Sequence, residues 1–190
     1  MTGFYRDKGT GKILLKSFGT GYFIPSKDLK GRVVSMQVRT DRGEKRYYSF
    51  SSSHEFGGAE MRPQMHFVGV NVNLPPQVIY LTEGALKADV AHYLSGGVPF
   101  ASIPGVNNYR VLTSGLQELK DAGITSSTII LATDMDEEQN INVQNSIKKI
   151  KTKVAEAGFR IEQCKWPLSE AKGIDDYLLS QIKKSAFGVK

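Results

Sequence analysis

The chain contains 190 residues, of which 40% are hydrophobic and 23% are charged, and this size suits one soluble domain or one domain with a small appendage. A single cysteine and three histidines exclude an internal disulfide and a conventional structural zinc site. No apolar run approaches the length of a transmembrane helix, and the first residues lack the apolar core of a signal peptide, so a cytoplasmic location is expected.

Positive charge is concentrated in the first third of the chain. The net charge is +6; residues 1–66 hold 12 Lys and Arg against 6 Asp and Glu, whereas residues 67–190 hold 13 of each sign. A basic segment attracts polyanions such as nucleic acid. A basic surface that merely faces solvent is an equally open interpretation of charge alone.

The same first third contains short runs that predict strands. Within one of them, Val34, Met36 and Val38 alternate with polar residues, which is typical of a strand with one buried face. Turn signals containing glycine separate the runs, which cover residues 21–25, 32–39 and 47–50. We therefore expect a small basic β-rich subdomain over residues 1–73, with a further short strand near residues 66–68.

Strands and helices alternate in the rest of the chain. Apolar runs of strand length and amphipathic runs of helix length follow one another, and Gly96, Gly123 and Gly158 end three of the helices. The expected strands are 78–82, 98–103, 127–133 and 159–166, and the expected helices are 85–94, 111–122, 141–157 and 174–184. This alternation predicts a parallel, doubly wound sheet flanked by helices over residues 74–190.

Acidic residues follow two of these strands. Glu83 comes directly after the first strand and before Gly84, and Asp134 and Asp136 follow the third. Ligands bind at the carboxyl ends of the strands in an open α/β sheet, so we expect the three acids to converge. Converging carboxylates repel unless a cation lies between them, and their hard oxygens suit Mg²⁺ or Mn²⁺. A structural interpretation is also open, in which these acids complement or cap the helices that follow them.

At these residues the sequence resembles the TOPRIM domain, which DnaG-type primases, type IA and type II topoisomerases, OLD-family nucleases and RecR-type repair proteins share. The similarity rests on Glu83-Gly84 after one strand and Asp134-x-Asp136 after a later one. The flanking segment 81–89, Leu-Thr-Glu-Gly-Ala-Leu-Lys-Ala-Asp, is most similar to replication proteins of phages, plasmids and integrative elements. The resemblance covers residues 76–185.

The resemblance implies a TOPRIM fold, which is a Rossmann-like parallel sheet flanked by helices, and roles for individual residues. Glu83, Asp134 and Asp136 would be the catalytic acids and the ligands of Mg²⁺ or Mn²⁺, with Glu83 acting as a ligand or as a general acid or base. Lys172-x-x-Asp175 is similar to a late primase segment, in which Asp175 would support the metal and Lys172 would contact phosphate. Helix capping by Asp175 is equally open.

Nucleic-acid contacts are expected from several basic residues. Lys87 lies one helical turn after Glu83 and would face the same cleft, although a surface position is also open for it. In the first third, cations alternate with Tyr47 and Tyr48, which suits single-stranded nucleic acid because bases stack on rings while phosphates pair with cations. The expected contacts there are Arg32, Arg39, Arg42, Lys45 and Arg46. The alternative is a basic edge strand that discourages aggregation.

Together these features predict the catalytic core of a primase-like replication protein from a mobile genetic element. The implied reaction is metal-dependent nucleotidyl transfer, which joins nucleoside triphosphates on a single-stranded DNA template. A helicase or another replication protein would be a further partner, and no membrane is involved. Two alternatives are a TOPRIM nuclease, although the sequence has no Gly-x-x-x-x-Gly-Lys-Ser/Thr motif, and a non-catalytic TOPRIM module that binds DNA.

Overall fold

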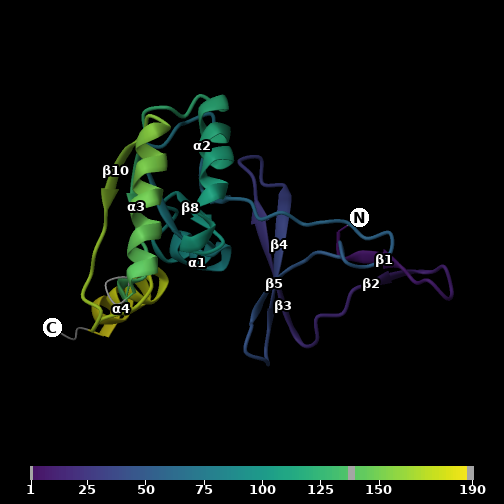
Figure 1. Ribbon diagram of the computed structural model, residues 1–190. Coiled ribbons are helices and arrows are strands. Elements are labelled where there is room, and N and C mark those ends of the chain that lie inside the picture. The colour runs from purple at the N-terminus through teal and green to yellow at the C-terminus, as the bar shows by residue number, and fades with distance from the viewer. Residues whose placement is uncertain (1, 137–139, 188–190) are drawn as a thin grey trace. The chain divides into compact units, whose positions relative to one another are not determined.

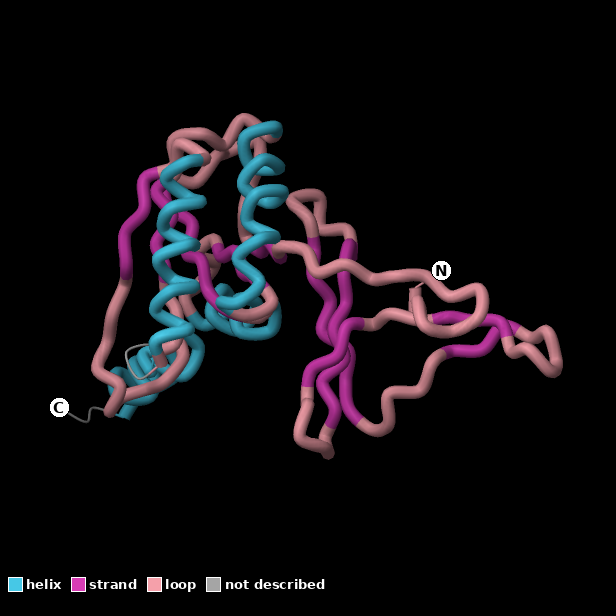
Figure 2. Tube along the Cα trace, in the orientation of Figure 1, coloured by secondary structure: helices cyan, strands magenta, loops and turns pink. Residues whose placement is uncertain are grey.

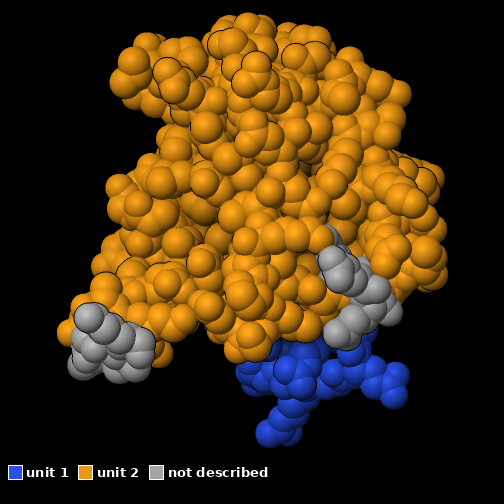
Figure 3. Space-filling model, turned by 90° about the vertical axis from the view of Figure 1, so that its left-hand side faces the viewer, with its two compact units in different colours: residues 1–26, 33–64 blue, residues 27–32, 65–190 orange. Residues whose placement is uncertain are grey.

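The computed structural model describes residues 2–136 and 140–187 (Figure 1). The chain forms two compact units, one of residues 1–26 and 33–64 and the other of residues 27–32 and 65–190 (Figure 3). The division at residues 73 and 74 stays a prediction, because compactness alone does not show that a segment folds by itself. No helix in the described part of the chain is long and apolar enough to cross a membrane.

The first unit is drawn as strands joined by loops (Figure 2). It contains an antiparallel hairpin and a three-stranded sheet in the order β3-β4-β5, in which β4 and β5 run antiparallel. Its strands are β1 (Phe4–Arg6), β2 (Ile13–Leu15), β3 (Gly21–Lys27), β4 (Val33–Thr40) and β5 (Tyr47–Ser49). Ile24, Val38 and Phe50 are buried in its core. The expected β-rich character is confirmed, whereas the β1–β2 hairpin was not expected because that stretch is polar.

The second unit is built on a five-stranded sheet in the order β10-β9-β7-β8-β6. Its strands are β6 (His66–Val68), β7 (Val78–Glu83), β8 (Phe100–Ile103), β9 (Thr128–Leu131) and β10 (Arg160–Gln163). Four of them run parallel, as expected, and β6 pairs antiparallel with β8 at one edge. The helices are α1 (Ala85–Leu94), η1 (Val106–Val111), α2 (Leu112–Asp121), α3 (Ile141–Glu156) and α4 (Ile174–Phe187). The short 3₁₀ helix η1 is the one element among these that the sequence pattern did not predict.

Each face of this sheet has its own apolar core. On one face, Ile79 and Leu81 of β7 pack with α2 and α3 through buried side chains such as Leu116 and Ile150. On the other face, Tyr80 and Phe100 pack with α1 and α4. Burial on both faces explains why these strands are continuous apolar runs, and the helices on both faces confirm the α/β fold class. The carboxyl ends of the parallel strands therefore share one edge.

His66 connects three segments of the second unit. Its side chain is 1% exposed. The backbone N–H of Lys27 donates to Nδ1 at 3.0 Å, so the proton lies on Nε2, which is 3.1 Å from Oδ1 of Asp89 on α1. Burial is the main cause that lowers the pKa of His66, although the charge of Asp89 opposes it. A protonated ring would lose the bond from Lys27, because Nδ1 would then carry hydrogen.

This geometry predicts how stability depends on pH. Because the pKa of His66 is lowered in the folded chain, its contribution is present above the unfolded value of 6.5 and is lost as pH falls toward the lowered value. We expect His66→Gln to flatten the decline in the free energy of unfolding below about pH 6.5, measured by urea denaturation. The matched control is His54→Gln, at an exposed histidine. Parallel curves for His66→Gln and wild type would contradict this role.

Candidate functional site

The acids predicted to converge leave the sheet from neighbouring strands. β7 ends at Glu83, and β9, its parallel neighbour, ends at Leu131, three residues before Asp134. Gly84 then turns the chain into α1 with a φ of 78°, a left-handed conformation that glycine adopts without steric cost. The turn keeps Glu83 at the sheet edge rather than on the helix.

Glu83 is held close to a second negative charge. The half-buried carboxylate is stabilised by the backbone N–H groups of Val106 and Asp134. Burial, and next the charge of Asp134, nevertheless raise its pKa, while the nearby Lys87 lowers it. A raised pKa beside a second carboxylate is a feature of functional sites, although structural ion-pair networks produce it too.

Lys87 supplies a positive charge within this cluster. It lies in the first turns of α1, and its Nζ forms an ion pair with Oδ1 of Asp134. The two side chains are only 19% and 21% exposed, so solvent screens the pair weakly. The sequence placed Lys87 near the cleft but gave no indication that it would neutralise an acid.

Lys172 adds a second, more exposed ammonium group. Its Nζ lies 2.7 Å from Oδ2 of Asp136 and 3.7 Å from Oδ2 of Asp134, and its side chain is 57% exposed. The hydrogen bond to Asp136 is the main cause that raises the pKa of Lys172. The backbone N–H of Met135 donates to the carbonyl of Lys172 at 2.9 Å, which ties the two loops together.

Asp175 completes the cluster from the start of α4. Its Oδ1 is buried and has no hydrogen-bond partner among the described residues. Burial raises the pKa of Asp175, and the charge of Lys87 opposes that effect. A Cβ built on Gly173 would lie 3.1 Å from Nζ of Lys87, so the glycine lets Asp175 and Lys87 approach each other. Backbone N–H groups of Asp175 and Asp176 also lower the pKa of this carboxyl group, as in helix capping, so capping and metal support both stay open for Asp175.

The donor chemistry of the cluster fits a hard divalent cation. Its four acids, Glu83, Asp134, Asp136 and Asp175, offer only carboxylate oxygens, and two ammonium groups leave two negative charges unbalanced when all are ionised. Within residues 2–136 and 140–187, however, no three acids, histidines or cysteines are grouped so as to hold a metal. Lys87 and Lys172 lie on the aspartates instead. The metal site therefore stays a prediction.

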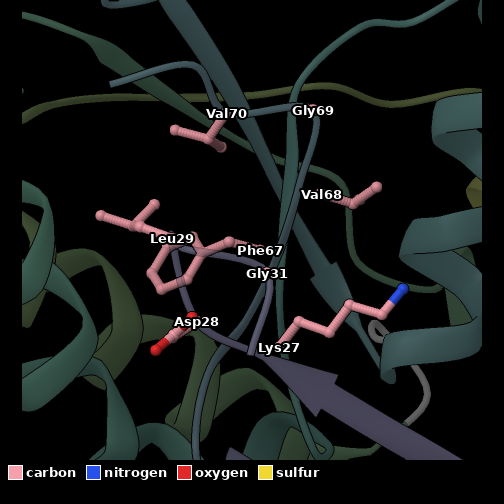
Figure 4. Close-up of a pocket in the computed structure, with 8 residues that line it drawn as sticks. All are labelled: Lys27, Asp28, Leu29, Gly31, Phe67, Val68, Gly69 and Val70. Carbon is pink, nitrogen blue, oxygen red and sulfur yellow. The ribbon is translucent and has the colours of Figure 1, made fainter. Parts of the chain in front are cut away.

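The basic residues expected to bind nucleic acid are divided between the two compact units. Arg32 belongs to the second unit, where its Nε donates to Asp28 at 2.7 Å. Asp28 also lines a hollow of about 260 Å³ beside β6 (Figure 4). In the first unit, Arg39 lies over the rings of Tyr22 and Tyr47, at 5.5 and 6.0 Å from their centroids. Arg42, Lys45 and Arg46 are exposed there.

The fold of the chain is similar to that of DnaG-type primase catalytic domains. The primase fragment of the bacteriophage T7 primase-helicase protein shares 17% identity and a TM-score of 0.54, over 98% of this chain and 65% of that one. A DNA primase domain from Pseudomonas aeruginosa shares 15% identity and a TM-score of 0.60, over 100% and 56%. A DnaG primase catalytic domain bound to single-stranded DNA shares 15% identity and a TM-score of 0.56, over 98% and 56%. The chain thus spans less than two thirds of each of these solved chains.

Sequence comparison defines the family. Residues 70–185 match a domain of unknown function, DUF3854, and the chain belongs to that family. No curated protein is similar enough to the sequence to be matched. The matched range contains every residue of the acidic cluster.

The difference in burial between the two lysines gives a test of the cluster. Removing one partner of a buried ion pair leaves an uncompensated charge, so we expect Lys87→Met to lower the free energy of unfolding by about 1–3 kcal/mol. Lys172→Met removes the same charge from a more exposed position and should cost less than about 1 kcal/mol. Urea denaturation at neutral pH measures both. Equal losses would contradict the larger contribution expected of the less exposed lysine, and no loss in Lys87→Met would show that Lys87 does not stabilise Asp134.

Proposed function

We propose that this chain is the catalytic core of a primase-like replication protein that joins nucleoside triphosphates on a single-stranded DNA template. The observation that carries this proposal is the half-buried Glu83 with its raised pKa, held beside Asp134 at the carboxyl edge of a primase-type sheet. A raised pKa brings a carboxylate nearer to the operating pH, where it is a more effective proton acceptor.

In this proposal Glu83 accepts the proton of the attacking hydroxyl group or helps to bind the metal. Asp134, Asp136 and Asp175 would hold Mg²⁺ or Mn²⁺, which when bound neutralises the triphosphate and activates the hydroxyl. Binding at Asp134 requires Lys87 to leave that carboxylate. Lys87 and Lys172 would then pair with substrate phosphates, the role expected of Lys172 from its resemblance to a primase segment.

If a metal ion replaces Lys87 at Asp134, substitutions at these two residues should change metal affinity in opposite directions. We expect Asp134→Asn to weaken Mn²⁺ binding by at least about tenfold, because an amide is a poorer ligand than a carboxylate. Lys87→Met should instead strengthen binding, since it removes the competing cation. Titration calorimetry without nucleic acid measures both, and Lys172→Met is the matched lysine control, with a smaller gain. Equal affinity in wild type and Asp134→Asn would remove Asp134 from the metal site.

Catalysis depends on Glu83 in this proposal. Gln is nearly isosteric with Glu, so Glu83→Gln should keep the fold and DNA binding while lowering synthesis by about 10²-fold or more. The assay combines single-stranded DNA, Mg²⁺ or Mn²⁺ and labelled nucleotides. The control is Glu162→Gln, at an exposed glutamate on β10. A folded Glu83→Gln protein with wild-type synthesis would overturn the mechanism and return Glu83 to a helix-dipole role.

A non-catalytic module that binds DNA is the second candidate. The observation that favours it is the neutralisation of Asp134 and Asp136 by the two lysines. The same incubation separates the candidates. Synthesis would join the labelled nucleotides into longer products, and a TOPRIM nuclease would shorten the DNA. A module that only binds DNA would leave both the nucleotides and the DNA unchanged.

A further inference from the structure

A hollow in the first compact unit combines aromatic rings with ammonium groups. Its volume is about 490 Å³, within the range of small-molecule sites, and Lys16, Phe18, Lys45, Tyr48 and His54 are among the residues that line it. All of them belong to residues 1–26 and 33–64. The hollow is therefore complete within one unit.

The rings of this hollow are held in place by the core beneath them. Tyr48 lies on β5 opposite the buried Val38, and its ring centroid is 6.4 Å from that of Phe18. Phe18 in turn lies 5.7 Å from the buried Phe50. The rings of Phe18 and Tyr48 are half-buried. A planar ligand can therefore stack on a surface that is already ordered, which lowers the entropic cost of binding.

The ammonium groups of Lys16 and Lys45 differ in whether a carboxylate pairs with them. Nζ of Lys45 lies 5.0 Å from the Tyr48 ring centroid, and no acid pairs with Lys45 in the described part of the chain. Nζ of Lys16 lies 5.9 Å from the Phe18 centroid but also 3.3 Å from Oε1 of Glu55. Lys45 is thus the cation available to an incoming anion, next to the ring on which a base would stack.

We infer that this hollow binds one nucleotide unit, with the aromatic base stacked on Tyr48 and the phosphate paired with Lys45, an inference that rests on the proposed function. An aromatic platform beside a mobile cation is the arrangement by which proteins bind single-stranded nucleic acid without sequence preference. A nucleotide within a DNA strand and a free nucleoside triphosphate present the same base and phosphate. Both are therefore tested.

The test measures binding by the full chain without metal, so that no synthesis occurs. Fluorescence anisotropy follows labelled oligo(dT), an abasic strand of equal length, and labelled ATP. The variants are Tyr48→Ala, Tyr48→Phe and Lys45→Ala. The matched controls are Phe56→Ala and Lys8→Ala, which dismantle another lysine–ring contact of the same unit, with Nζ 5.8 Å from the ring centroid. Circular dichroism checks the fold of each.

We expect Tyr48→Ala to weaken binding of the base-containing ligand by at least about fivefold, while Tyr48→Phe and both controls stay near wild type. Lys45→Ala should lower the slope of log affinity against log salt by about 0.7 for single-stranded DNA. Effects on oligo(dT) alone assign the site to the strand, and effects on ATP assign it to the free triphosphate. If Tyr48→Ala does not fold, weaker binding of the abasic strand than of oligo(dT), with a loss in Lys45→Ala, carries the same conclusion.

Wild-type affinity for both ligands in Tyr48→Ala and Lys45→Ala would overturn the inference. So would equal binding of oligo(dT) and the abasic strand, because stacking would then contribute nothing. Loss of synthesis in Glu83→Gln leaves these binding results unchanged. Failure of the proposed catalysis and failure of this nucleotide site are therefore separate outcomes.

Discussion

The candidate site depends on the parallel pairing of β7 with β9. Leu81 lies opposite Leu131 in this register, so Glu83 and the loop with Asp134 emerge side by side at one edge of the sheet. The two faces pack against different sets of side chains, so a slip of one residue would move every side chain to the other face and disrupt both cores. Packing therefore forces two carboxylates together against their mutual repulsion, and the pKa of Glu83 is raised by burial first and by the charge of Asp134 second.

Two lysines from different elements neutralise part of the charge of the acidic cluster, at Asp134 and Asp136. Lys87 comes from α1, whose buried alanines pack on the sheet, and Lys172 comes from a loop tied to Met135. Trp166 also holds the loop that contains Lys172. Its indole N–H donates to the carbonyl of Ala171 at 3.0 Å, and its ring stacks on Tyr177. The cluster thus contains one largely buried ammonium group, that of Lys87, and one exposed group, that of Lys172. The two groups therefore differ in how strongly solvent screens them.

In the first unit, cations contact aromatic rings. Arg39 lies over the ring of Tyr22 and Lys45 over that of Tyr48, whereas Lys16 also pairs with Glu55. A cation over a ring stays available to phosphate, because the ring does not neutralise it. In the proposed function, the acidic cluster would bind a metal and the aromatic surface of the first unit would bind a base and a phosphate.

The sequence by itself determined the order of elements in the second unit and the three acids at strand ends. Long apolar runs and glycine stops are local signals, so α1 was predicted at residues 85–94 as observed. It did not reveal that β6, which was expected as a short strand near residues 66–68, pairs antiparallel with β8. It also did not reveal the helix η1 or the β1–β2 hairpin, because such short segments take their structure from neighbours distant in the sequence. The pair of Arg32 with Asp28 is local, four residues apart, and was not predicted from the sequence. The tertiary structure alone decided that Lys87 lies on Asp134. Ion pairs depend on where side chains meet in space, and no spacing along the chain specifies that for a helix and a loop 47 residues apart.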